Sequence, residues 1–588
     1  MIAKQTLSLL LNTGRTIKQG ISMEAEGKLS EAYADAVARI ELNEDDMKAL
    51  GITDGSLVEV ISKEGSIKIR AFRSKEVKRG HAYVPMGPWA NMIVDPQTMS
   101  LGMPNYKYTI INVRPSEGKP TSLIEILAHY NAIIPTEIED IELRGGSQKV
   151  YEYMVCPFCG ELCDHLKLEV VGNEIKKVIG GCANSVSKLR NYHKHRILRP
   201  LIREGGHFRE VSLEEALRRA ARILSSAKYP LLFGWSSTVN EAIRVGVELA
   251  EILRGVIDNT SVVCHGPTAL GAQDVGTARS TLGIIRHKAD YIVIWGSNPS
   301  ASHQNHFSLW IFSRGKWIKG RKNRKVVVID VRETPAARLA DELVRVEPGK
   351  DYELITALRM AVRDLDIELP SVAGVPTETI YRLADEMKSA KYGVIFEGMG
   401  ITMTGAKHRN VEELIKLAHD LNEWTRFVLI PMRGHYNVTG SDNVFLWTTG
   451  YPFGIDFSRG YPRMVPGVTT APDLLMRGEV DAALIISSDP VAHFPKRAVE
   501  HLSKIPVITI DPKWSLTATI SDVIIPSGIV GVECGGTAYR LDDVPLRIKS
   551  ILPPPPGVLC DDEILRRLLE MVKEYRNEGG RKRGEGYS

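Results

Sequence analysis

Four cysteines between residues 156 and 182 could bind an iron–sulfur cluster. Cys156, Cys159 and Cys163 lie close together, and Cys182 follows after a short charged segment. Four thiolates in such a pattern can hold the four corners of a [4Fe–4S] cubane. A structural zinc site usually has two C-x2-C pairs, whereas this segment has a single one, and disulfide frameworks are typical of small secreted proteins. We therefore predict a [4Fe–4S] cluster, with zinc binding or a structural role as the alternatives.

Cys264 is a further cysteine whose sequence neighbours suggest a reactive or metal-binding thiolate. The apolar run Ser261–Val263 predicts a strand that leads into it, and Gly266 with Pro267 predicts the start of a helix. The helix N–H groups and the adjacent His265 would stabilise a thiolate at this position. Such a thiolate could act as a nucleophile or as a ligand to a soft, high-valent metal ion. A buried core cysteine without chemistry is the alternative.

A polar stretch from Arg433 to Asn437 follows the apolar run Phe427–Ile430. At the end of a strand, the planar guanidinium of Arg433 can hold a small carboxylate or a CO2-like substrate. The alternative is a salt bridge inside the crevice. Arg433 is therefore a candidate for substrate binding.

The chain after about residue 201 follows the pattern of an α/β fold. Apolar strands alternate with amphipathic helices such as Glu214–Ser225 and Val411–Trp424, which predicts a mostly parallel sheet with helices on both faces. Besides the run before Cys264, the predicted strands are Pro230–Phe233, Tyr291–Trp295, Val326–Ile329, Gly393–Phe396, Phe427–Ile430, Ala482–Ile486 and Val507–Ile510.

Two parts of this region repeat the same order of motifs. Each has a strand, a Ser-Asn-Pro or Ser-Asp-Pro turn, a helix, and another strand that ends in Ile-Asp. Ligands of parallel α/β sheets lie beyond the C-terminal strand ends, where helix N-termini attract phosphate, so we predict two similar nucleotide-like ligands. The alternative is that these polar residues merely cap helices, a role worth about 1 kcal/mol each. The candidate residues are Gly296, Ser297, Asn298 and Asp330 in the first part, and Ser488, Asp489 and Asp511 in the second.

The first 130 residues have a different character, with short alternating runs separated by Gly and Asp turns. This pattern predicts a small β-barrel. The loop from Pro85 to Asn91 is rich in Gly and Pro. Exposed backbone N–H groups near Gly87, together with the Asn91 amide, would suit a phosphate or the edge of a heterocycle. Ordinary hairpin turns are the alternative.

The overall composition is that of an ordinary globular protein. The chain has 588 residues, 43% hydrophobic and 25% charged, with a formal net charge of +4. So small a charge favours neither a nucleic-acid partner nor a membrane surface, and no apolar run approaches the roughly 20 residues of a membrane helix. Seven cysteines, four of them clustered, indicate a reducing compartment, so we expect a cytoplasmic protein. We interpret Cys534 and Cys560, which lack reactive neighbours, as structural.

Several stretches of the chain together carry a resemblance to a known family. They are Cys156–Cys163, Cys264–Pro267, Gln273–Gly276, Trp295–Pro299, Arg433–Asn437 and Gly535–Arg540, and, nearer the N-terminus, Gly87–Asn91 and Gly102–Pro104. Through the first six, residues 153 to about 545 resemble the catalytic B subunit of formylmethanofuran dehydrogenase, within the molybdopterin oxidoreductase superfamily. Through the last two, residues 1 to about 125 resemble the D subunit of the same complex, a small barrel that binds molybdopterin dinucleotide. The chain thus looks like a fusion of the two.

The resemblance implies a multi-domain molybdopterin oxidoreductase fold and its cofactors. The chain would consist of a barrel over residues 1–130, a linker over 131–150, a [4Fe–4S] domain over 151–200, α/β domains over 201–550, and a C-terminal helix with a charged tail over 551–588. Two molybdopterin guanine dinucleotides would hold tungsten or molybdenum, and Cys264 would supply the protein thiolate to that metal. The cofactor-binding residues would further include Arg433, Gly434, His435 and Thr537.

The activity that the resemblance implies is the reversible reduction of CO2 to formate. His265 and Arg433 would position the substrate and manage its proton, while an iron–sulfur subunit or a ferredoxin would supply electrons through the cluster. Lys188 or Arg190 would lie between cluster and pterin, unless both belong to a solvated helix face. Formate would pass to an amidohydrolase that resembles the A subunit of such complexes and condenses it with methanofuran, and a chain like their C subunit is a further expected partner. The alternatives are a stand-alone formate dehydrogenase or another molybdopterin oxidoreductase, and a scaffold subunit without catalysis.

Overall fold

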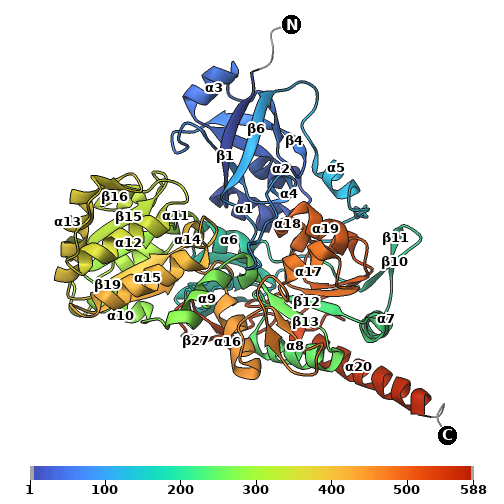
Figure 1. Cartoon of the computed structure of the whole chain (residues 1–588). Coiled ribbons are helices and arrows are strands. Elements are labelled where there is room, and N and C mark those ends of the chain that lie inside the picture. The colour runs from blue at the N-terminus through green and yellow to red at the C-terminus, as the bar shows by residue number, and fades with distance from the viewer. Residues whose placement is uncertain (1–4, 585–588) are drawn as a thin grey trace.

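The computed structural model describes residues 5–584 and confirms a closed β-barrel at the N-terminus (Figure 1). Its strands alternate in exposure, because Val58 and Val60 are fully buried whereas Glu59 between them is partly exposed. The first strand pairs with both β5 and β6, which closes the barrel. In barrel order the strands are β1 (Leu7–Gly14), β5 (His81–Pro85), β2 (Arg39–Leu42), β4 (Ser66–Arg73), β3 (Leu57–Ile61) and β6 (Thr109–Pro115).

Short helices fill the connections of the barrel. The Thr16 hydroxyl accepts a hydrogen bond from the Gln19 N–H at 3.1 Å and so starts α1. The loop Pro85–Asn91, for which ordinary hairpin turns were an alternative, opens a helix instead, with Pro88 in its first turn. The helices are α1 (Ile17–Glu26), α2 (Glu31–Val37), α3 (Glu44–Leu50) and α4 (Pro88–Asn91).

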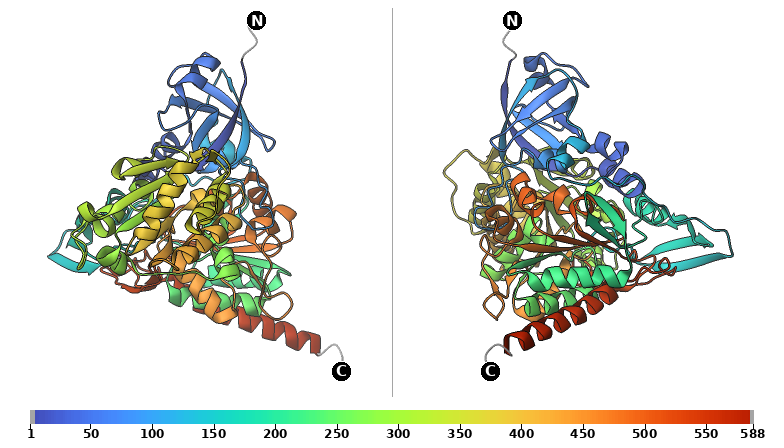
Figure 2. Two further views of the ribbon diagram at one scale, coloured as in Figure 1. Left: turned by 60° about the vertical axis from the view of Figure 1, so that its left-hand side comes forward. Right: turned by 90° about the vertical axis from the view of Figure 1, so that its right-hand side faces the viewer.

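A three-stranded sheet and a short helix form the segment that carries the four clustered cysteines. The pattern Gly172-Asn173 predicts a hairpin turn here, and Val171 indeed pairs with Glu174 across it. Gly172 has a φ of 61°, a left-handed conformation that glycine adopts without strain. In Figure 2 this teal hairpin projects from the body of the molecule. The elements from the linker onward are α5 (Leu123–Ala128), β7 (Gln148–Met154), β8 (Leu166–Val171), β9 (Glu174–Ile179) and α6 (Ala183–Arg190).

The α/β region contains two sheets instead of one. The chain leaves the nine-stranded sheet after β13 and returns to it at β21, so the five-stranded sheet is an insertion. All neighbours in the five-stranded sheet are parallel, in the order β16 (Glu342–Arg345), β15 (Lys325–Asp330), β14 (Tyr291–Trp295), β19 (Gly393–Glu397) and β20 (Phe427–Pro431). The nine-stranded sheet runs β11 (His207–Glu210), β10 (Leu201–Glu204), β25 (Val523–Pro526), β24 (Val507–Asp511), β23 (Ala482–Ile486), β12 (Pro230–Gly234), β13 (Val256–Asn259), β21 (Ile455–Asp456) and β22 (Arg463–Met464).

Helices cover the sheets, so that the central strands are buried on both faces. In β14, Val293 and Ile294 belong to apolar clusters on opposite faces of the five-stranded sheet. Figure 1 shows the barrel above the junction of the two sheets and α20 at the opposite end. No helix within the described residues combines the length and the apolarity that a bilayer crossing requires. The larger helices, in which α7 and α15 confirm the two predicted ones, are α7 (Leu213–Ser226), α8 (Asn240–Leu253), α9 (Gly266–Val275), α10 (Leu282–Lys288), α12 (Asp351–Val362), α13 (Thr377–Ser389), α15 (His408–Leu421), α16 (Val438–Thr449), α17 (Ala471–Arg477), α19 (Lys496–Leu502) and α20 (Asp561–Gly584).

The strand predicted at Ser261–Val263 is wrong. Strand β13 ends at Asn259, and residues 260–263 form a 3-10 helix, η1 (Thr260–Val263). The Asn259 side chain accepts a hydrogen bond from the Ser261 N–H at 2.9 Å, and Asp442 accepts one from the Ser261 hydroxyl at 2.6 Å. These buried polar partners stabilise a turn where the β-branched residues alone favour a strand. Helix α9 nevertheless begins at the predicted Gly-Pro pair.

Candidate active site

A cavity of about 500 Å³ lies where the barrel meets the C-terminal strand ends of both sheets. Gly296 and Ser297 follow β14 and reach it from the five-stranded sheet, while Ser487 follows β23 and reaches it from the nine-stranded sheet. Residues of α1 and β5 line it from the barrel. Ligands of open α/β sheets bind at this edge. The cavity is therefore the place where the chain can hold a cofactor.

Two carboxylates that the repeated motif singled out, Asp330 and Asp511, line this one cavity from different sheets. Asp330 Oδ1 accepts a hydrogen bond from the Arg332 N–H at 3.1 Å, and Asp511 Oδ1 accepts one from the Lys513 N–H at 3.1 Å. Burial raises the pKa of both carboxyls, that of Asp511 to about 7. A ligand that donates hydrogen bonds to them would favour their ionised forms.

The turns before these carboxylates also have the same backbone hydrogen bond. The Gly296 N–H donates at 2.9 Å to the last carbonyl but one of β15, and the Ser487 N–H donates at 2.9 Å to the corresponding carbonyl of β24. In the same turns, the side-chain oxygens of Asn298 and Ser488 are buried without a hydrogen-bond partner among residues 5–584. Both residues line the cavity, so a bound ligand can supply the missing donor. The capping alternative does not hold for Asn298, whose side chain makes no capping bond to α11 (Pro299–Ser302).

Asp489 occupies the place in its turn that Asn298 occupies in the other. Its carboxylate accepts from the Lys28 ammonium at 2.7 Å and from the backbone N–H groups of Leu516 and Thr517 at 3.1 and 2.9 Å. Asp489 is 2% exposed. Although Asp489 lines the cavity, its carboxylate is already occupied by hydrogen bonds that join the barrel to the sheet.

The cavity is lined by many cations. Burial lowers the pKa of Lys107 and of Lys513 to about 8, a cost that the negative charge of a phosphate would offset. Burial together with nearby cations lowers the pKa of His435 to about 3, so this imidazole is neutral at neutral pH. These cations suit the phosphates of a ligand, although carboxylates such as Asp330 and Asp511 line the same cavity. The lining cations are Arg15, Lys28, Lys78, Lys107, Lys188, Arg332 and Lys513.

Cys264 lies in the wall of the same cavity, between η1 and α9. Burial raises the pKa of its thiol to about 11, while the Gly434 N–H and the positive charge of Arg433 act in the opposite direction. The Thr402 hydroxyl donates to the Cys264 carbonyl at 2.9 Å and so holds the turn in place. A metal ion bound by this sulfur would replace the thiol proton.

His265 is fully buried beside Cys264 and does not line the cavity. Its Nε2 atom lies 3.2 Å from the Met432 carbonyl oxygen, and its Nδ1 atom lies 3.2 Å from the Thr268 hydroxyl. Thr268 donates in turn to one oxygen of Glu397 at 2.6 Å. The other oxygen of Glu397 has no hydrogen-bond partner in the described part of the chain. The imidazole is thus held by a buried chain of polar groups.

Arg433 is buried as well, and it forms an ion pair with Asp442. Asp442 also accepts hydrogen bonds from the Ser261 hydroxyl at 2.6 Å and from the Asn259 amide at 3.0 Å. The salt bridge considered from the sequence is therefore present. The Nε atom of Arg433 is without a partner within residues 5–584, although Arg433 itself does not line the cavity.

The four clustered cysteines are free thiols. The Cys156 N–H donates to the Cys163 carbonyl at 2.9 Å, and the Asn305 amide lies 3.8 Å from the Cys163 sulfur. Burial, together with the nearby Cys182 thiol, raises the pKa of Cys156 to about 12. Among the described residues, no three His, Cys, Asp or Glu side chains converge closely enough to hold one metal ion. A cubane binds each thiolate through a different iron atom and accepts wider spacing, so four free thiols fit it better than a single zinc ion.

A loop that starts at Arg433 connects this cysteine segment with Cys264. The Gly160 N–H donates to the Gly434 carbonyl at 3.3 Å, and Cys159 forms an isolated antiparallel bridge with the residue after Gly434. A side chain does not fit at Gly160, since its Cβ would lie 2.4 Å from the Arg433 carbonyl oxygen. The Gly434 N–H acts against the rise in the pKa of the Cys264 thiol, and both residues line the cavity. The loop therefore lies beside both sulfur sites.

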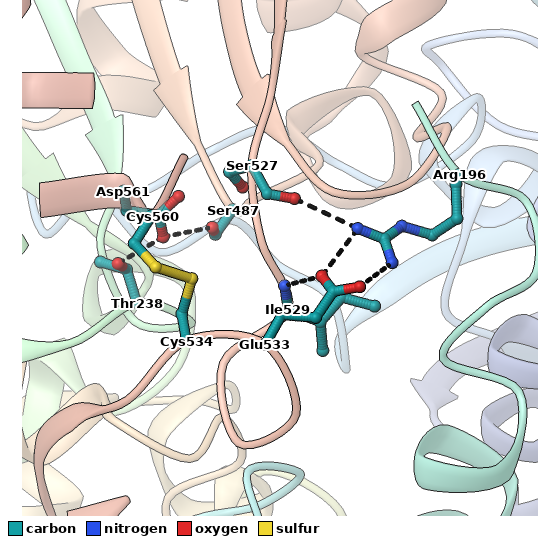
Figure 3. Close-up of a disulfide and its surroundings, with 9 residues drawn as sticks. All are labelled: Arg196, Thr238, Ser487, Ser527, Ile529, Glu533, Cys534, Cys560 and Asp561. Atoms are coloured by element: carbon teal, nitrogen blue, oxygen red, sulfur yellow. Dashed lines mark hydrogen bonds and ion pairs between the residues drawn. A yellow bond between two sulfur atoms is a disulfide. The ribbon is translucent and has the colours of Figure 1, made fainter. Parts of the chain in front are cut away.

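A disulfide between Cys534 and Cys560 lies next to the cavity wall, although nothing in their sequence neighbourhood indicated a bond (Figure 3). Disulfides are rare in reducing compartments, with proteins of hyperthermophiles as an exception. Beside it, the Glu533 carboxylate binds the Arg196 guanidinium through two hydrogen bonds of 2.7 and 2.9 Å. Glu533 also accepts from the N–H of Ile529, which lines the cavity. The disulfide and the buried ion pair thus hold this wall in place.

Comparisons with known proteins agree with this geometry. A family profile described as molybdopterin oxidoreductase matches residues 196–571, which is more than half of the chain. The chain belongs to the molybdopterin oxidoreductase family. A second profile, described as Molydopterin dinucleotide binding domain, matches residues 9–110, which form most of the barrel. As a molybdopterin oxidoreductase, the chain is an enzyme that binds a molybdopterin cofactor.

Relatives of this molybdopterin oxidoreductase belong to larger enzymes. The B subunit of the tungsten-containing formylmethanofuran dehydrogenase 2 of Methanocaldococcus jannaschii is 48% identical over 431 residues, which are 72% of this chain and 99% of that protein. Protein FwdD of the same organism is 44% identical over 102 residues, which are 17% of this chain and 76% of that protein. The formyltransferase/hydrolase complex FhcABCD from Methylorubrum extorquens, solved with methylofuran, shares the fold with a TM-score of 0.52 and 24% identity, over 64% of this chain and 99% of the matched one.

Several residues predicted to bind the cofactor do not line the cavity of this molybdopterin oxidoreductase. Gly87 and Asn91 lie in the barrel outside the cavity, and both polar atoms of the Asn91 side chain are buried without a partner among the described residues. The Thr537 hydroxyl donates to Glu241 at 2.9 Å. Their roles in cofactor binding stay predictions. Of the two cations proposed to lie between cluster and pterin, Lys188 lines the cavity and Arg190 is exposed.

Other cavity residues were missed from the sequence. Lys513 follows Asp511 by two residues, as Arg332 follows Asp330, so extending the repeated motif would have found both cations. Lys28 carries no such signal, because nothing in the local sequence shows that the barrel covers the cavity.

Proposed function

We propose that this chain is the redox catalytic subunit of a formylmethanofuran dehydrogenase. It reduces CO2 reversibly to formate, and the reaction consumes two electrons and one proton (CO2 + 2 e⁻ + H⁺ → HCOO⁻). The observation that carries the proposal is the position of the loop Arg433–His435, because His435 pairs with Cys159 of the cluster segment, and His435 and Cys264 line the same cavity. The 48% identity to the B subunit of a tungsten-containing relative supports the choice of substrate.

The residues of the cavity fit the cofactors of such an enzyme. Cys264 would be the protein ligand to tungsten or molybdenum, and the four clustered cysteines would hold a [4Fe–4S] cluster. Asn298 with Asp330, and Ser488 with Asp511, would bind two molybdopterin guanine dinucleotides, since these residues line the cavity from the strand ends of the two sheets. When bound, these groups supply one-electron storage at the cluster and two-electron exchange with CO2 at the metal.

The polar chain beside Cys264 can hold a proton for the reaction. The Nε2 atom of His265 faces a carbonyl oxygen and must donate, and the Thr268 hydroxyl lies between the Nδ1 atom and Glu397. These hydrogen bonds link the imidazole to the carboxylate and offer a path for a proton next to the cavity wall.

Arg433 can orient the substrate from behind the loop. Its guanidinium is fixed by Asp442, and its free Nε donor is buried. A donor already fixed and desolvated loses little entropy on binding an anion such as formate. Arg433 would therefore bind formate or CO2 through small movements of the loop.

The expected partners follow from the relatives. Similarity to a B subunit of formylmethanofuran dehydrogenase and to FwdD in one chain supports assembly with an amidohydrolase like the A subunit and with a chain like the C subunit, the other expected members of such a complex. The amidohydrolase would condense formate with methanofuran. An iron–sulfur subunit or a ferredoxin would supply the electrons.

A pair of cysteine variants tests the assignment in the cofactor-loaded protein. Cys264→Ser should lower viologen-linked CO2 reduction at least about 100-fold, since changes to groups that merely support a metal ligand already cost about 10–100-fold. It should leave the electron paramagnetic resonance spectrum of the reduced cluster unchanged. Cys182→Ser serves as the matched control and should alter that spectrum, because it removes a cluster ligand. Retained CO2 reduction in Cys264→Ser would reject the metal-ligand assignment.

Two further outcomes would replace the proposal. Elemental analysis that finds iron but neither tungsten nor molybdenum would favour a scaffold subunit. Full formate turnover in the absence of an amidohydrolase, with no methanofuran product when the amidohydrolase is added, would favour a stand-alone formate dehydrogenase.

A further inference from the structure

A cationic surface lies around Trp317, in the loop between η2 (Phe307–Ile311) and β15. Here it is called the Trp317 surface, and all six of its side chains are exposed. No carboxylate within residues 5–584 forms an ion pair with its five cations, whereas the neighbouring Arg321 and Lys325 pair with Asp341 and Glu342. The Trp317 surface consists of Lys288, Lys316, Trp317, Lys319, Lys391 and Arg426.

The acidic residue that lies in this surface does not neutralise it by an ion pair. Asp290 accepts hydrogen bonds from the backbone N–H groups of Lys391 and Tyr392, at 3.0 and 2.9 Å. Its carboxylate therefore holds the start of β19 beside the end of α10. The ammonium and guanidinium groups around it are left to solvent.

Trp317 itself is an unusual residue for a solvated loop. It is 61% exposed, and the ammonium nitrogens of Lys288 and Lys316 lie 5.1 and 5.0 Å from its ring centroid. Two like charges over one exposed ring repel each other and leave apolar area in water. An acidic partner would relieve both costs, because carboxylates would pair with the lysines and the partner surface would cover the ring.

Arg324 holds the loop as a rigid platform. It is buried, and its guanidinium donates to the carbonyls of Ala289 at 3.1 Å, Trp310 at 3.1 Å and Ser313 at 3.3 Å. These carbonyls belong to the end of α10, to η2 and to the segment after η2. The cations of the Trp317 surface are thus presented by a fixed backbone, which lowers the entropy cost of docking.

The same segment begins at the predicted cluster. The Asn305 amide lies 3.8 Å from the Cys163 sulfur and donates to the Gly180 carbonyl at 3.0 Å. Leu309, one turn further on, packs against the apolar core of the cysteine segment. Along the chain, a single helical turn and a short loop therefore separate Asn305, which lies beside Cys163, from Trp317.

We propose that the Trp317 surface is the docking site of a small acidic iron–sulfur electron carrier. This inference rests on the proposed function, since the carrier would reduce the cluster held by the four cysteines. In each encounter one electron passes from the reduced carrier to the oxidised cluster. No bond forms or breaks in this step.

Charge and composition favour a transient protein partner. Exposed lysines at an interface mainly raise the association rate, and redox encounters bury little area. The whole chain has a net charge of just +4, so the cations are concentrated locally and do not reflect a generally basic protein.

A charge-reversal pair tests the site in the cofactor-loaded chain. The variant is Lys316→Glu with Lys319→Glu, and the matched control is Lys63→Glu with Lys119→Glu, two exposed lysines of the barrel and linker. Stopped-flow reduction of the cluster is followed with a reduced, acidic two-cluster ferredoxin and, separately, with methyl viologen radical. The ferredoxin rate constant should fall about 10-fold or more at low salt in the Trp317-surface variant, and the difference should shrink at high salt. The viologen rate and the control variant should match the wild type.

Each other outcome contradicts the inference in a distinct way. An unchanged ferredoxin rate in the variant would place the docking site elsewhere, while leaving the proposed function standing. An unchanged ferredoxin rate with lost binding of single-stranded DNA would make the surface a nucleic-acid site. A wild-type chain whose cluster is not reduced even by viologen would overturn the proposed function and this inference together.

Discussion

The two walls of the cavity, one from each sheet, can be compared residue by residue. In both, an aspartate at a strand end accepts the N–H two residues further along, at 3.1 Å. In both, the residue after the preceding strand has a left-handed backbone, with φ of 58° at Gly296 and 45° at Ser487. The walls differ two residues after this position, where one has Asn298 and the other has Asp489.

That difference decides how the hydrogen-bonding capacity of each wall is used. Asp489 is satisfied by Lys28 of the barrel and by two backbone N–H groups, whereas the side-chain oxygen of Asn298 has no partner within the described residues. Two turns with the same backbone conformation therefore have different roles. At this position the nine-stranded wall fastens the barrel over the cavity, whereas the five-stranded wall keeps a polar group available for a ligand, as the nine-stranded wall does at Ser488.

The links from the barrel to the two walls follow the same division. Lys28 and Asp489 have side-chain exposures of 14% and 3%, whereas Arg332 of the other wall pairs with Glu76 through side chains that are 29% and 26% exposed. The more buried pair is less screened by solvent. The nine-stranded side should therefore carry more of the stability of the barrel contact.

The largest expected effect comes from removing one partner of the buried pair. Asp489→Ala leaves Lys28 uncompensated in a buried site, and the free energy of unfolding should fall by about 3–5 kcal/mol. The matched change in the other wall, Asn298→Ala, should cost less than about 1 kcal/mol, because the lost oxygen has no partner among the described residues. Urea unfolding of the cofactor-free chain measures both. Equal losses in the two variants would contradict the division between the walls.

The next effect concerns pH. Burial raises the pKa of Asp511 from its usual 3.8 to about 7, so the folded chain holds this proton more tightly than the unfolded chain does. The resulting stability is fully present below about pH 4 and is lost as pH rises towards 7, to an extent on the order of 4 kcal/mol. The melting temperature of the cofactor-free chain should therefore fall between about pH 4 and pH 7, and Asp511→Asn should flatten that fall.

Asp330→Asn is the matched control for the other wall. Burial raises the pKa of Asp330 as well, but Arg332 opposes the change. The variant should flatten the pH dependence less than Asp511→Asn does. An equal or larger effect of Asp330→Asn would show that the two carboxylates have the same environment, contrary to the structure.

The features that the sequence predicted well have strong local signals. The hairpin turn at Gly172-Asn173, the barrel strands and the α/β alternation depend on turn residues and periodicity, which act over a few residues. The repeat that brings Asp330 and Asp511 to one cavity was also visible, because each half carries its own strand and turn. Local patterns thus predicted the fold class and the two walls.

The features that sequence could not predict depend on partners far along the chain. Residues 261–263 form a 3-10 helix because Asp442, 181 residues away, accepts from the Ser261 hydroxyl. His265 and Arg433 belong to recognisable motifs, yet their orientation is set by Thr268 with Glu397 and by Asp442, which no local pattern connects to them. The attachment of Lys28 to Asp489 spans 461 residues. Such contacts arise from tertiary packing and leave no periodicity to read.

The smallest expected effect tests how interchangeable the two turns are. A non-glycine residue in the left-handed region costs of order 1–3 kcal/mol, and Ser487 already bears this strain. A Cβ at Gly296 would in addition lie 3.0 Å from the Gly400 Cα atom and the Ile401 nitrogen, so Gly296→Ser should lower the free energy of unfolding by at least about 1–2 kcal/mol. Ser487→Gly should change it by less than about 1 kcal/mol, because relief of strain offsets the greater freedom of glycine in the unfolded chain.

Urea unfolding of the two variants measures this asymmetry. If Ser487→Gly costs as much as Gly296→Ser, the Ser487 hydroxyl contributes more than its 3.4 Å hydrogen bond to Asp561 indicates. Ser487 would then resemble Asp489, which binds Lys28, because both side chains of the nine-stranded wall would be used for bonds within the protein instead of for a ligand. If the expected asymmetry is found, the two walls have the same backbone conformation but different side-chain requirements. The five-stranded wall then needs glycine at position 296 because Gly400 packs against it.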